Sequence, residues 1–261
     1  EESLSANAKV EHLIAFPKKI NLSSPVEYTQ ILVEDDLGGG RTTDVTRMVS
    51  WKGNKDLGKI DNRGVITPNK NGEGSLIATL GDKSAKITVS VTGMGQEYKP
   101  DFISEVNPVI SKLGCNAGTC HGAKDGKNGF KLSLRGYDAL YDIRGFTDDM
   151  ASRRVNLAAP ERSLMLLKAT GMVPHEGGQL TREDSRYHRI IKSWIGEGAP
   201  VNWKARRVRE IKLYPQNPVV EEIGVTQQFR VVAFYEDGVV RDVTREAFVT
   251  SGNGEVAEHD D

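Results

Sequence analysis

The tetrapeptide Asp44-Val45-Thr46-Arg47 occurs again, 198 residues further along the chain, as Asp242-Val243-Thr244-Arg245. The landmarks around it keep the same spacing: Pro17, Gln30, Val33 and Gly40 recur as Pro215, Gln228, Val231 and Gly238. Agreement at one constant shift over about thirty residues, with no gap, indicates that a single module has been duplicated.

Each copy of this module carries the local pattern of β-strands. Residues 228–234 of the second copy are rich in β-branched and aromatic residues and precede the turn sequence Glu236-Asp237-Gly238. The comparable runs of the first copy are residues 30–33, 64–68, 74–80 and 85–91. Six or seven short strands in about 90 residues, separated by turns, predict a β-sandwich.

The order of Pro, Gln-x-x-Val, Gly, Asp-Val-Thr, Trp and Gly-x-x-Thr-Pro in the first copy resembles the bacterial Ig-like group 2 domain. The resemblance covers residues 8–93 in full, but only about half of such a domain in the second copy. It implies an all-β Ig-like sandwich at 1–96 and a second, incomplete Ig-like β domain at 208–261. Half a sandwich cannot close its core, so we expect a fragment of a longer protein, or strands supplied otherwise. Similar domains occur in adhesins and surface proteins, which implies carbohydrate or protein contacts.

The segment between the two copies has a helical pattern instead. Apolar residues recur at helical spacing within 102–113 and within 187–195. A third helix is predicted from residue 164, and the hydroxyl of Thr181 can cap the last one. Residues 99–205 are therefore predicted to form a small all-α domain, which makes the chain multidomain.

Composition narrows the classes of function. Hydrophobic residues make up 38% of the chain and charged residues 27%, which is typical of a folded soluble protein. No run of apolar residues is long enough for a transmembrane helix. The net charge of −1 argues against nucleic-acid binding as the main function, although residues 99–209 alone carry +7. The start Glu1-Glu2-Ser3 has no signal peptide, so an exported protein would have lost it already.

The two cysteines of the chain lie in Cys115-Asn116-Ala117-Gly118-Thr119-Cys120-His121. The usual attachment motif of haem c is C-x-x-C-H, in which each thiol forms a thioether and the histidine becomes the proximal iron ligand. Here the loop has four intervening residues, so Ala117 and Gly118 must bulge outward. The alternative is a disulfide that closes the loop. A zinc site would need further ligands that the sequence lacks.

The middle segment resembles the planctomycete-type cytochrome c domain. The resemblance rests on the C-x4-C-H-Gly site and on later stretches, which are residues 129–136, 154–156 with 160–164, 173–178 and 194–200. It implies one haem c, attached covalently to Cys115 and Cys120, with His121 as the proximal iron ligand.

At the position of the sixth iron ligand, this sequence differs from the pattern of that family. Related domains place a methionine where this chain has Val173, whose side chain cannot bind iron. His175, two residues further on in a glycine-rich loop, is the preferred distal ligand. The alternatives are Met172, His188 and an open axial site.

Three arginines can contact the haem propionates, because guanidinium groups pair well with carboxylates. They are Arg135, Arg153 and Arg154, and for each the alternative is an ordinary surface arginine.

These observations predict an exported c-type cytochrome module, periplasmic or at the cell surface, that transfers one electron to an unidentified redox partner protein. The Ig-like domains would act as spacers or surface contacts. No nucleophile–base pair or phosphate-binding loop stands out, which favours electron transfer over an enzyme. Two other classes stay open. One is an adhesion or structural protein with a Cys115–Cys120 disulfide, and the other is a haem-based enzyme or sensor with an open axial site.

Overall fold

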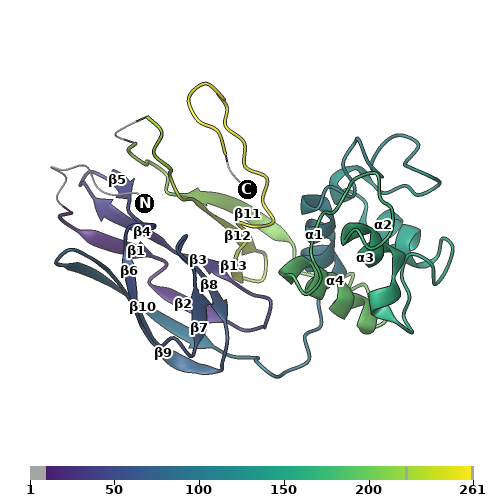
Figure 1. The fold of residues 1–261 in the computed structure, drawn as a ribbon, viewed down its shortest axis with the longest axis horizontal. Helices are drawn as coiled ribbons and strands as arrows, with labels where there is room; N and C mark the ends of the chain where they lie inside the picture. The colour runs from purple at the N-terminus through teal and green to yellow at the C-terminus, as the bar shows by residue number, and fades with distance from the viewer. Residues whose placement is uncertain (1–9, 221–222, 260–261) are drawn as a thin grey trace. The chain divides into compact units, whose positions relative to one another are not determined.

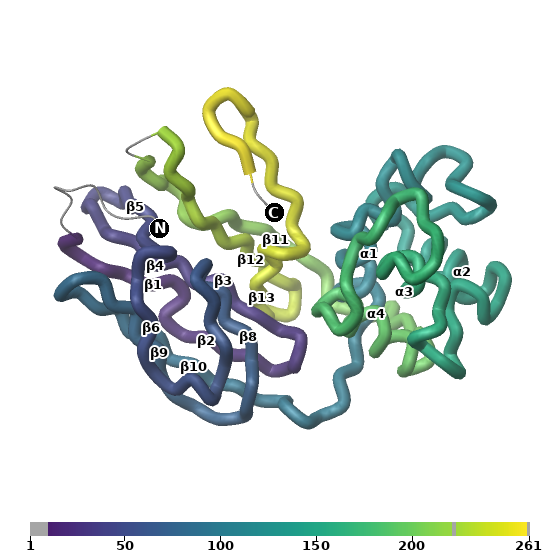
Figure 2. The backbone as a smooth tube through the Cα atoms, in the orientation of Figure 1, coloured from purple at the N-terminus to yellow at the C-terminus, as the bar shows by residue number. Residues whose placement is uncertain are grey.

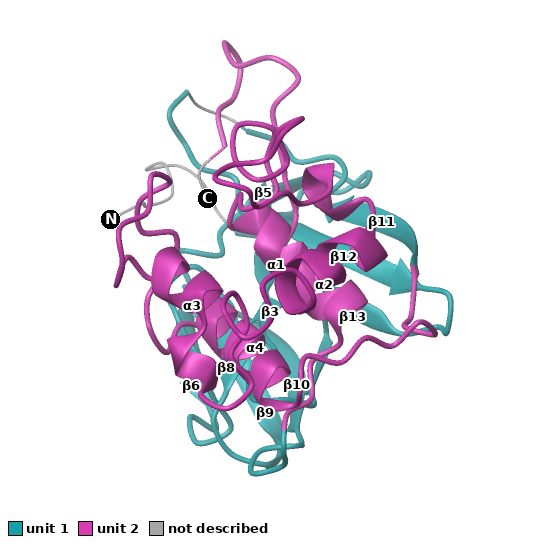
Figure 3. Ribbon diagram, turned by 90° about the vertical axis from the view of Figure 1, so that its right-hand side faces the viewer, with its two compact units in different colours: residues 1–97, 208–244 teal, residues 98–207, 245–261 magenta. Residues whose placement is uncertain are grey.

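The structure is a computed structural model that describes residues 10–220 and 223–259. Glu1-Glu2-Ser3, considered above for a signal peptide, lies outside these ranges. The chain forms two compact units, which are coloured separately in Figure 3. Unit 1 combines residues 1–97 with 208–244, and unit 2 combines 98–207 with 245–261.

The first copy of the repeat forms three sheets within unit 1 (Figure 1). The first sheet has the order β1-β4-β5, with β1 at Leu13–Phe16, β4 at Leu32–Asp36 and β5 at Thr42–Asp44. The second has the order β2-β10-β9-β6, with strands at Lys19–Leu22, Lys83–Val91, Gly72–Leu80 and Ser50–Gly53. The third has the order β3-β8-β7, with strands at Thr29–Gln30, Val65–Pro68 and Gly58–Ile60.

The core of the first copy follows from strand alternation. In β10 the residues Ala85, Ile87, Val89 and Val91 are buried, whereas the residues between them face outward. β10 pairs antiparallel with β9 and parallel with β2, so the three strands belong to one sheet that covers one side of the core. Ala15 and Val33 of the first sheet and Ile66 of the third pack against the same cluster. The three sheets therefore enclose one hydrophobic core.

The second copy forms a three-stranded sheet with the order β11-β12-β13. Its strands are Val208–Tyr214, Arg230–Tyr235 and Val240–Asp242, and a shift of 198 residues superposes them on β1, β4 and β5. The antiparallel pairing is the same in both sheets. Duplication of sequence has thus produced duplication of a sheet.

The repeated tetrapeptide makes the same turn in both copies. The Oδ1 atom of Asp44 accepts a hydrogen bond from the backbone N–H of Thr46 at 2.9 Å, and the Thr46 hydroxyl accepts one from the N–H of Val33 at 2.8 Å. In the second copy the Asp242–Thr244 bond measures 3.0 Å, and the bond from Val231 to the Thr244 hydroxyl measures 2.9 Å. Asp and Thr are needed because these short side chains can bond to nearby backbone groups.

The two copies pack against each other within unit 1. The rings of Phe16 and Tyr214, which occupy equivalent positions, lie 4.8 Å apart between centroids. The guanidinium of Arg230 lies 5.0 Å from the Phe16 ring centroid, and the N–H of Val219 donates to the Thr42 carbonyl at 2.8 Å. Figure 2 shows the β11–β13 segment beside β3, β4 and β5.

Unit 2 contains four short α-helices, named α1 at Asn107–Lys112, α2 at Ala139–Thr147, α3 at Leu164–Ala169 and α4 at Arg186–Gly196. A π-helical turn at Phe102–Val106 precedes α1, and 3-10 turns form at Leu134–Gly136 and Pro160–Arg162. The core of the unit is built around Trp194, whose ring lies 5.1 Å from that of Phe102 and 6.5 Å from that of Phe146. Within the described residues, no helix is long and apolar enough to cross a membrane.

The predicted fold class is wrong. The structure is mostly β-sheet, and residues 99–205 do not form a distinct all-α cytochrome domain, because the four helices contain only six, nine, six and eleven residues. Left-handed backbone at positions such as Asn128, Arg135 and Asp184 interrupts the helical pattern. Residues 208–244 of the second copy belong to the same compact unit as the first copy. The ranges 1–96, 99–205 and 208–261 as domain boundaries stay predictions.

The start of the last helix also differs from the prediction. Ser185, not Thr181, is its N-cap, and its hydroxyl accepts a hydrogen bond from the N–H of His188 at 3.3 Å. The Thr181 hydroxyl lies 2.7 Å from that of Ser185. Asp184 has a φ of 57°, in the left-handed region that a right-handed α-helix does not include. The helix therefore begins after Asp184.

Candidate functional site

The cysteine loop begins where α1 ends. Gly114 has a φ of 77°, and the N–H of Cys115 then bonds to the Ile110 carbonyl at 3.1 Å. This left-handed glycine after the last helical residues is the usual way in which a helix stops and its carbonyls are satisfied. The helix end therefore fixes the backbone position of Cys115.

The loop closes on itself at His121. The backbone N–H of His121 donates to the Cys115 carbonyl at 3.0 Å, and that of Cys120 donates to the Ala117 carbonyl at 2.9 Å. A Cβ atom on Gly122 would lie 2.1 Å from the Asn116 carbonyl oxygen, so only glycine fits there. On Gly118 a Cβ would meet only Leu134, at 3.6 Å. The four intervening residues are thus folded into consecutive tight turns.

Both cysteines are free and half-buried in the structure. Burial, with a smaller contribution from the neighbouring Cys120, raises the pKa of the Cys115 thiol to about 12. Cys115 is therefore a protonated thiol at neutral pH. This form can add its S–H bond across a vinyl group, but it is a poor ligand for a bare metal ion, which binds thiolate.

His121 is oriented by its own backbone neighbourhood. Its Nδ1 atom lies 3.1 Å from the carbonyl oxygen of Phe130, and the two rings lie 4.6 Å apart between centroids. Burial, opposed by this hydrogen bond, lowers the pKa of His121, so the ring is neutral. A neutral ring must carry its proton on Nδ1 to donate to a carbonyl, which leaves the Nε2 lone pair free to bind a metal.

His175 lies in the loop after α3. Its Nδ1 atom lies 2.9 Å from the Gly178 carbonyl, which assigns the same tautomer as in His121. Burial is the main cause that lowers the pKa of His121, and the charge of His175 acts in the same direction. The loop is held by Lys168, whose Nζ donates to the Pro174 carbonyl at 3.1 Å, and by an ion pair of 3.5 Å between Lys127 and Glu176.

The alternative axial ligands have other surroundings. The side chain of Met172 is 63% exposed. His188 is buried at the start of α4, where its Nδ1 accepts a hydrogen bond from the N–H of Asp184 at 3.2 Å. Burial lowers the pKa of His188, and it packs as a neutral ring.

The three arginines differ from one another. Arg154 is buried, and its guanidinium donates to the carbonyls of Gly145 and Asp149 at 2.8 and 2.9 Å. Arg153 is exposed and lies 3.9 Å from the sulfur of Met150. The Arg135 guanidinium lies 4.7 Å from the ring centroid of Phe248. Their contact with haem propionates stays a prediction.

Phe130 is the residue that sequence reasoning overlooked at this site. It lies in the stretch 129–136 that carries the cytochrome resemblance, yet nothing in that stretch signals that its carbonyl oxygen bonds to His121. In the part of the chain that the structure describes, no group of three or more His, Cys, Asp or Glu side chains could hold a metal ion by itself.

Comparisons with known proteins give little further information. No protein-family model matches the chain, and no curated protein matches it. Among solved structures, the crystal structure of the S-layer protein SbsC domains 4 and 5 is similar over 34% of this chain, with 13% sequence identity and a TM-score of 0.25. The match spans 55% of that S-layer chain.

Proposed function

We propose that residues 115–121 are the attachment site of one c-type haem, with thioethers at Cys115 and Cys120 and iron ligation by the Nε2 atom of His121. The observation that carries this proposal is the hydrogen bond between Nδ1 of His121 and the Phe130 carbonyl, directly after two free cysteines. Such an outer bond fixes the tautomer and ring orientation of a metal-binding histidine and raises its basicity.

The donor set fits this group. Two free cysteines are available for addition to two vinyl groups, and a neutral imidazole is available for the iron. The tight closure between Cys115 and His121 holds all three groups in one loop. When bound, the haem would supply an iron that cycles between its ferric and ferrous states.

We further propose His175 as the sixth ligand. Its Nδ1 atom is held by the Gly178 carbonyl, so its Nε2 lone pair is also free. Its loop is joined by the Lys127–Glu176 ion pair to the segment that contacts His121, whereas the Met172 side chain is exposed and that of His188 is buried in the packing of α4. Two histidine ligands leave no open position for a substrate, which favours electron transfer over catalysis.

On this proposal the protein works outside the cytoplasm, where haem is attached to c-type cytochromes, and exchanges single electrons with a partner protein. The basic charge of residues 99–209, +7, favours an acidic partner surface because complementary charge accelerates encounter. The sheets of unit 1 would serve as a spacer or contact module.

The test is expression of the chain, with an export signal added, together with a haem-attachment system. The expected product has an intact mass greater by one haem, keeps this haem through acid–acetone extraction and shows the absorption bands of a low-spin haem. Cys115→Ser and Cys120→Ser are each expected to prevent stable attachment through two thioethers. A parent mass that corresponds to the bare polypeptide, or to one that has lost two hydrogens in a disulfide, would overturn the proposal.

A further inference from the structure

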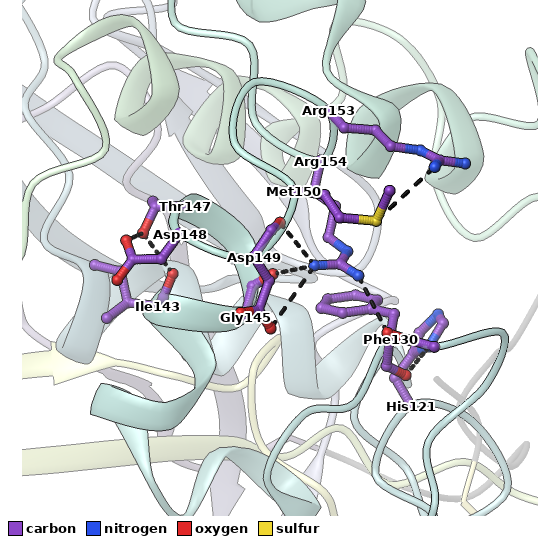
Figure 4. Close-up of polar contacts among 11 residues, drawn as sticks. His121, Phe130, Ile143, Gly145, Thr147, Asp148, Asp149, Met150, Arg153 and Arg154 are labelled. Carbon is purple, nitrogen blue, oxygen red and sulfur yellow. Dashed lines mark hydrogen bonds and ion pairs between the residues drawn. The ribbon is translucent and has the colours of Figure 1, made fainter.

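We infer that Arg154 is a positioning residue for His121: it holds the segment at Gly129 and Phe130 so that the Phe130 carbonyl keeps the His121 ring in the tautomer that leaves Nε2 free. This inference deepens the proposed haem site and rests on it for its consequence, but the geometry belongs to the protein alone. Figure 4 shows the guanidinium of Arg154 above the Phe130 ring, and the His121 ring next to the Phe130 carbonyl.

Arg154 is anchored by carbonyl oxygens from three segments. Its Nη1 atom donates to Gly145 at 2.8 Å and to Asp149 at 2.9 Å, and its Nη2 atom donates to Gly129 at 3.3 Å. The first two carbonyls belong to α2 and to the turn after it, and the third precedes Phe130. One buried side chain, 8% exposed, thus connects α2 to the segment that faces His121.

Phe130 transmits this anchoring to the histidine. The Arg154 guanidinium lies 4.2 Å from the Phe130 ring centroid. The same centroid lies 5.3 Å from the ring centroid of Phe146 and 4.6 Å from that of His121. The ring is therefore held between α2 and the arginine while its own carbonyl accepts from Nδ1 of His121. Movement of the Phe130 backbone would lengthen that hydrogen bond.

A fork-shaped cation is needed for this role. The guanidinium is planar and carries five N–H donors, so it can bond several carbonyls and still stack on an aromatic face. A lysine ammonium keeps the charge but offers neither the plane nor the fork. If the geometry of the guanidinium positions His121, and not its charge alone, Arg154→Lys should disturb the His121 tautomer almost as much as Arg154→Leu.

The charge of Arg154 has a second effect at the same histidine. Its guanidinium lies 4.2 Å from the ring centroid of Phe130, and that ring lies 4.6 Å from the ring of His121 between centroids. A cation near the iron ligand would also favour the less positive ferrous state, because it repels the additional charge of ferric iron. Loss of Arg154 is therefore expected to lower the reduction potential of the haem-loaded protein.

The decisive experiment uses the full chain without haem. Long-range ¹H–¹⁵N spectra report which ring nitrogen of His121 carries the proton. In the parent chain we expect the Nδ1–H tautomer to predominate, and in Arg154→Lys and Arg154→Leu its ratio to the Nε2–H tautomer should fall about fivefold, the value of one neutral hydrogen bond. An unchanged ratio in both variants would overturn the inference.

Arg144→Lys and Arg144→Leu are the matched controls, because Arg144 lies on the exposed face of α2 and has no role at the site. They should keep the tautomer ratio of the parent chain. If the Arg154 variants do not fold, Phe130→Leu decides instead: it removes the ring that contacts Arg154 but retains the carbonyl, and the ratio should again fall. An unchanged ratio in folded Phe130→Leu would contradict the proposed transmission.

Haem-loaded protein separates this inference from the function on which it rests. Arg154→Leu should lower the midpoint potential, Arg154→Lys should lower it less, and Arg144→Leu should leave it unchanged. If the parent chain never takes up haem, the proposed function fails, while the tautomer measurement on the haem-free chain still decides the role of Arg154.

Discussion

Asp44 and Asp242, which occupy the same position in the two copies of the repeat, each accept a hydrogen bond from the backbone of the other copy. The Oδ2 atom of Asp44 accepts from the N–H of Gln228 at 2.6 Å, and the Oδ2 atom of Asp242 accepts from the N–H of Gln30 at 2.8 Å. Gln30 and Gln228 are also equivalent positions. The exchange is reciprocal, as in an isologous dimer, although both partners belong to one chain.

Asp242 should contribute more to stability than Asp44. In addition to the N–H of Gln30, its Oδ2 atom accepts from Nε of Arg230 at 2.8 Å, and both side chains of this ion pair are buried. We expect Asp242→Ala to lower the free energy of unfolding by about 3–5 kcal/mol, because it leaves a buried cation unpaired. Asp44→Ala should lower it by about 1–3 kcal/mol, which is typical of a lost charged hydrogen bond.

Urea unfolding followed by circular dichroism measures both changes. Asp82→Ala is the control, because Asp82 forms an exposed ion pair of 3.6 Å with its neighbour Lys83, and exposed pairs contribute about 0–1 kcal/mol. Equal, small effects of all three substitutions would show that the reciprocal contacts do not hold the copies together.

Glu34 should make unit 1 less stable at neutral pH than in weak acid. Its side chain is 7% exposed, and its Oε1 atom has no hydrogen-bond partner among the described residues. Burial raises its pKa from the ordinary value of 4.5, opposed by a hydrogen bond from Thr42 and supported by the charges of Asp44 and Asp36. A raised folded-state pKa contributes stability that is present below the unfolded value and is lost as the pH rises through the folded value.

Glu34→Gln removes that titration. The free energy of unfolding at pH 7 should rise by about 1 kcal/mol, since an ionised group no longer has to be buried, and it should fall less steeply between weakly acidic and neutral pH. Glu73→Gln, at an exposed position of β9, should retain the pH dependence of the parent. If Glu34→Gln unfolds with the same pH profile as the parent, the carboxyl group of Glu34 is not the cause.

The sequence predicts the individual strands better than it predicts how the strands are grouped into sheets and units. Strand alternation and turn residues identify β8, β9, β10 and β12, because the pattern of burial in a strand is local. The contact between Phe16 and Tyr214 is not local: it joins positions 198 residues apart, and a repeat shows only that they are equivalent. The sequence therefore predicts two similar sheets without revealing that they share one unit.

The candidate site also combines features that the sequence shows with features that it does not. The spacing of Cys115, Cys120 and His121 could be recognised because all three groups lie in seven consecutive residues. The Phe130 carbonyl and the Arg154 guanidinium could not, because a backbone oxygen has no sequence signal and the arginine lies 33 positions from the histidine. The charge of Arg154 predicts a contact with the haem propionates, and the structure shows its guanidinium bonded to carbonyls.

The proposed axial ligation can be tested by two substitutions in the haem-loaded protein. His175→Ala should change the ferric spectrum from low-spin to high-spin or water-ligated and allow carbon monoxide to bind, because the sixth ligand is lost. Met172→Leu should change little, since the methionine side chain is exposed. If Met172→Leu opens the iron and His175→Ala does not, methionine is the ligand and the proposed histidine pair is wrong.

Two glycines in the cysteine loop offer a test of whether its closed shape is needed for haem attachment. A Cβ atom on Gly122 would lie 2.1 Å from the Asn116 carbonyl oxygen, whereas on Gly118 it would meet only Leu134 at 3.6 Å. Gly122→Ala must therefore displace backbone beside His121, and we expect it to reduce the yield of covalent haem at least about tenfold and to lower the free energy of unfolding by about 1–3 kcal/mol. Gly118→Ala adds the same methyl group at an ordinary contact distance from Leu134. It should leave the haem yield within about twofold, and the free energy of unfolding within about 0.5 kcal/mol, of the parent. The intact mass measures the yield of covalent haem, and urea unfolding measures the free energy of unfolding. Full haem attachment in Gly122→Ala would show that thioether formation does not depend on the loop closure between Cys115 and His121.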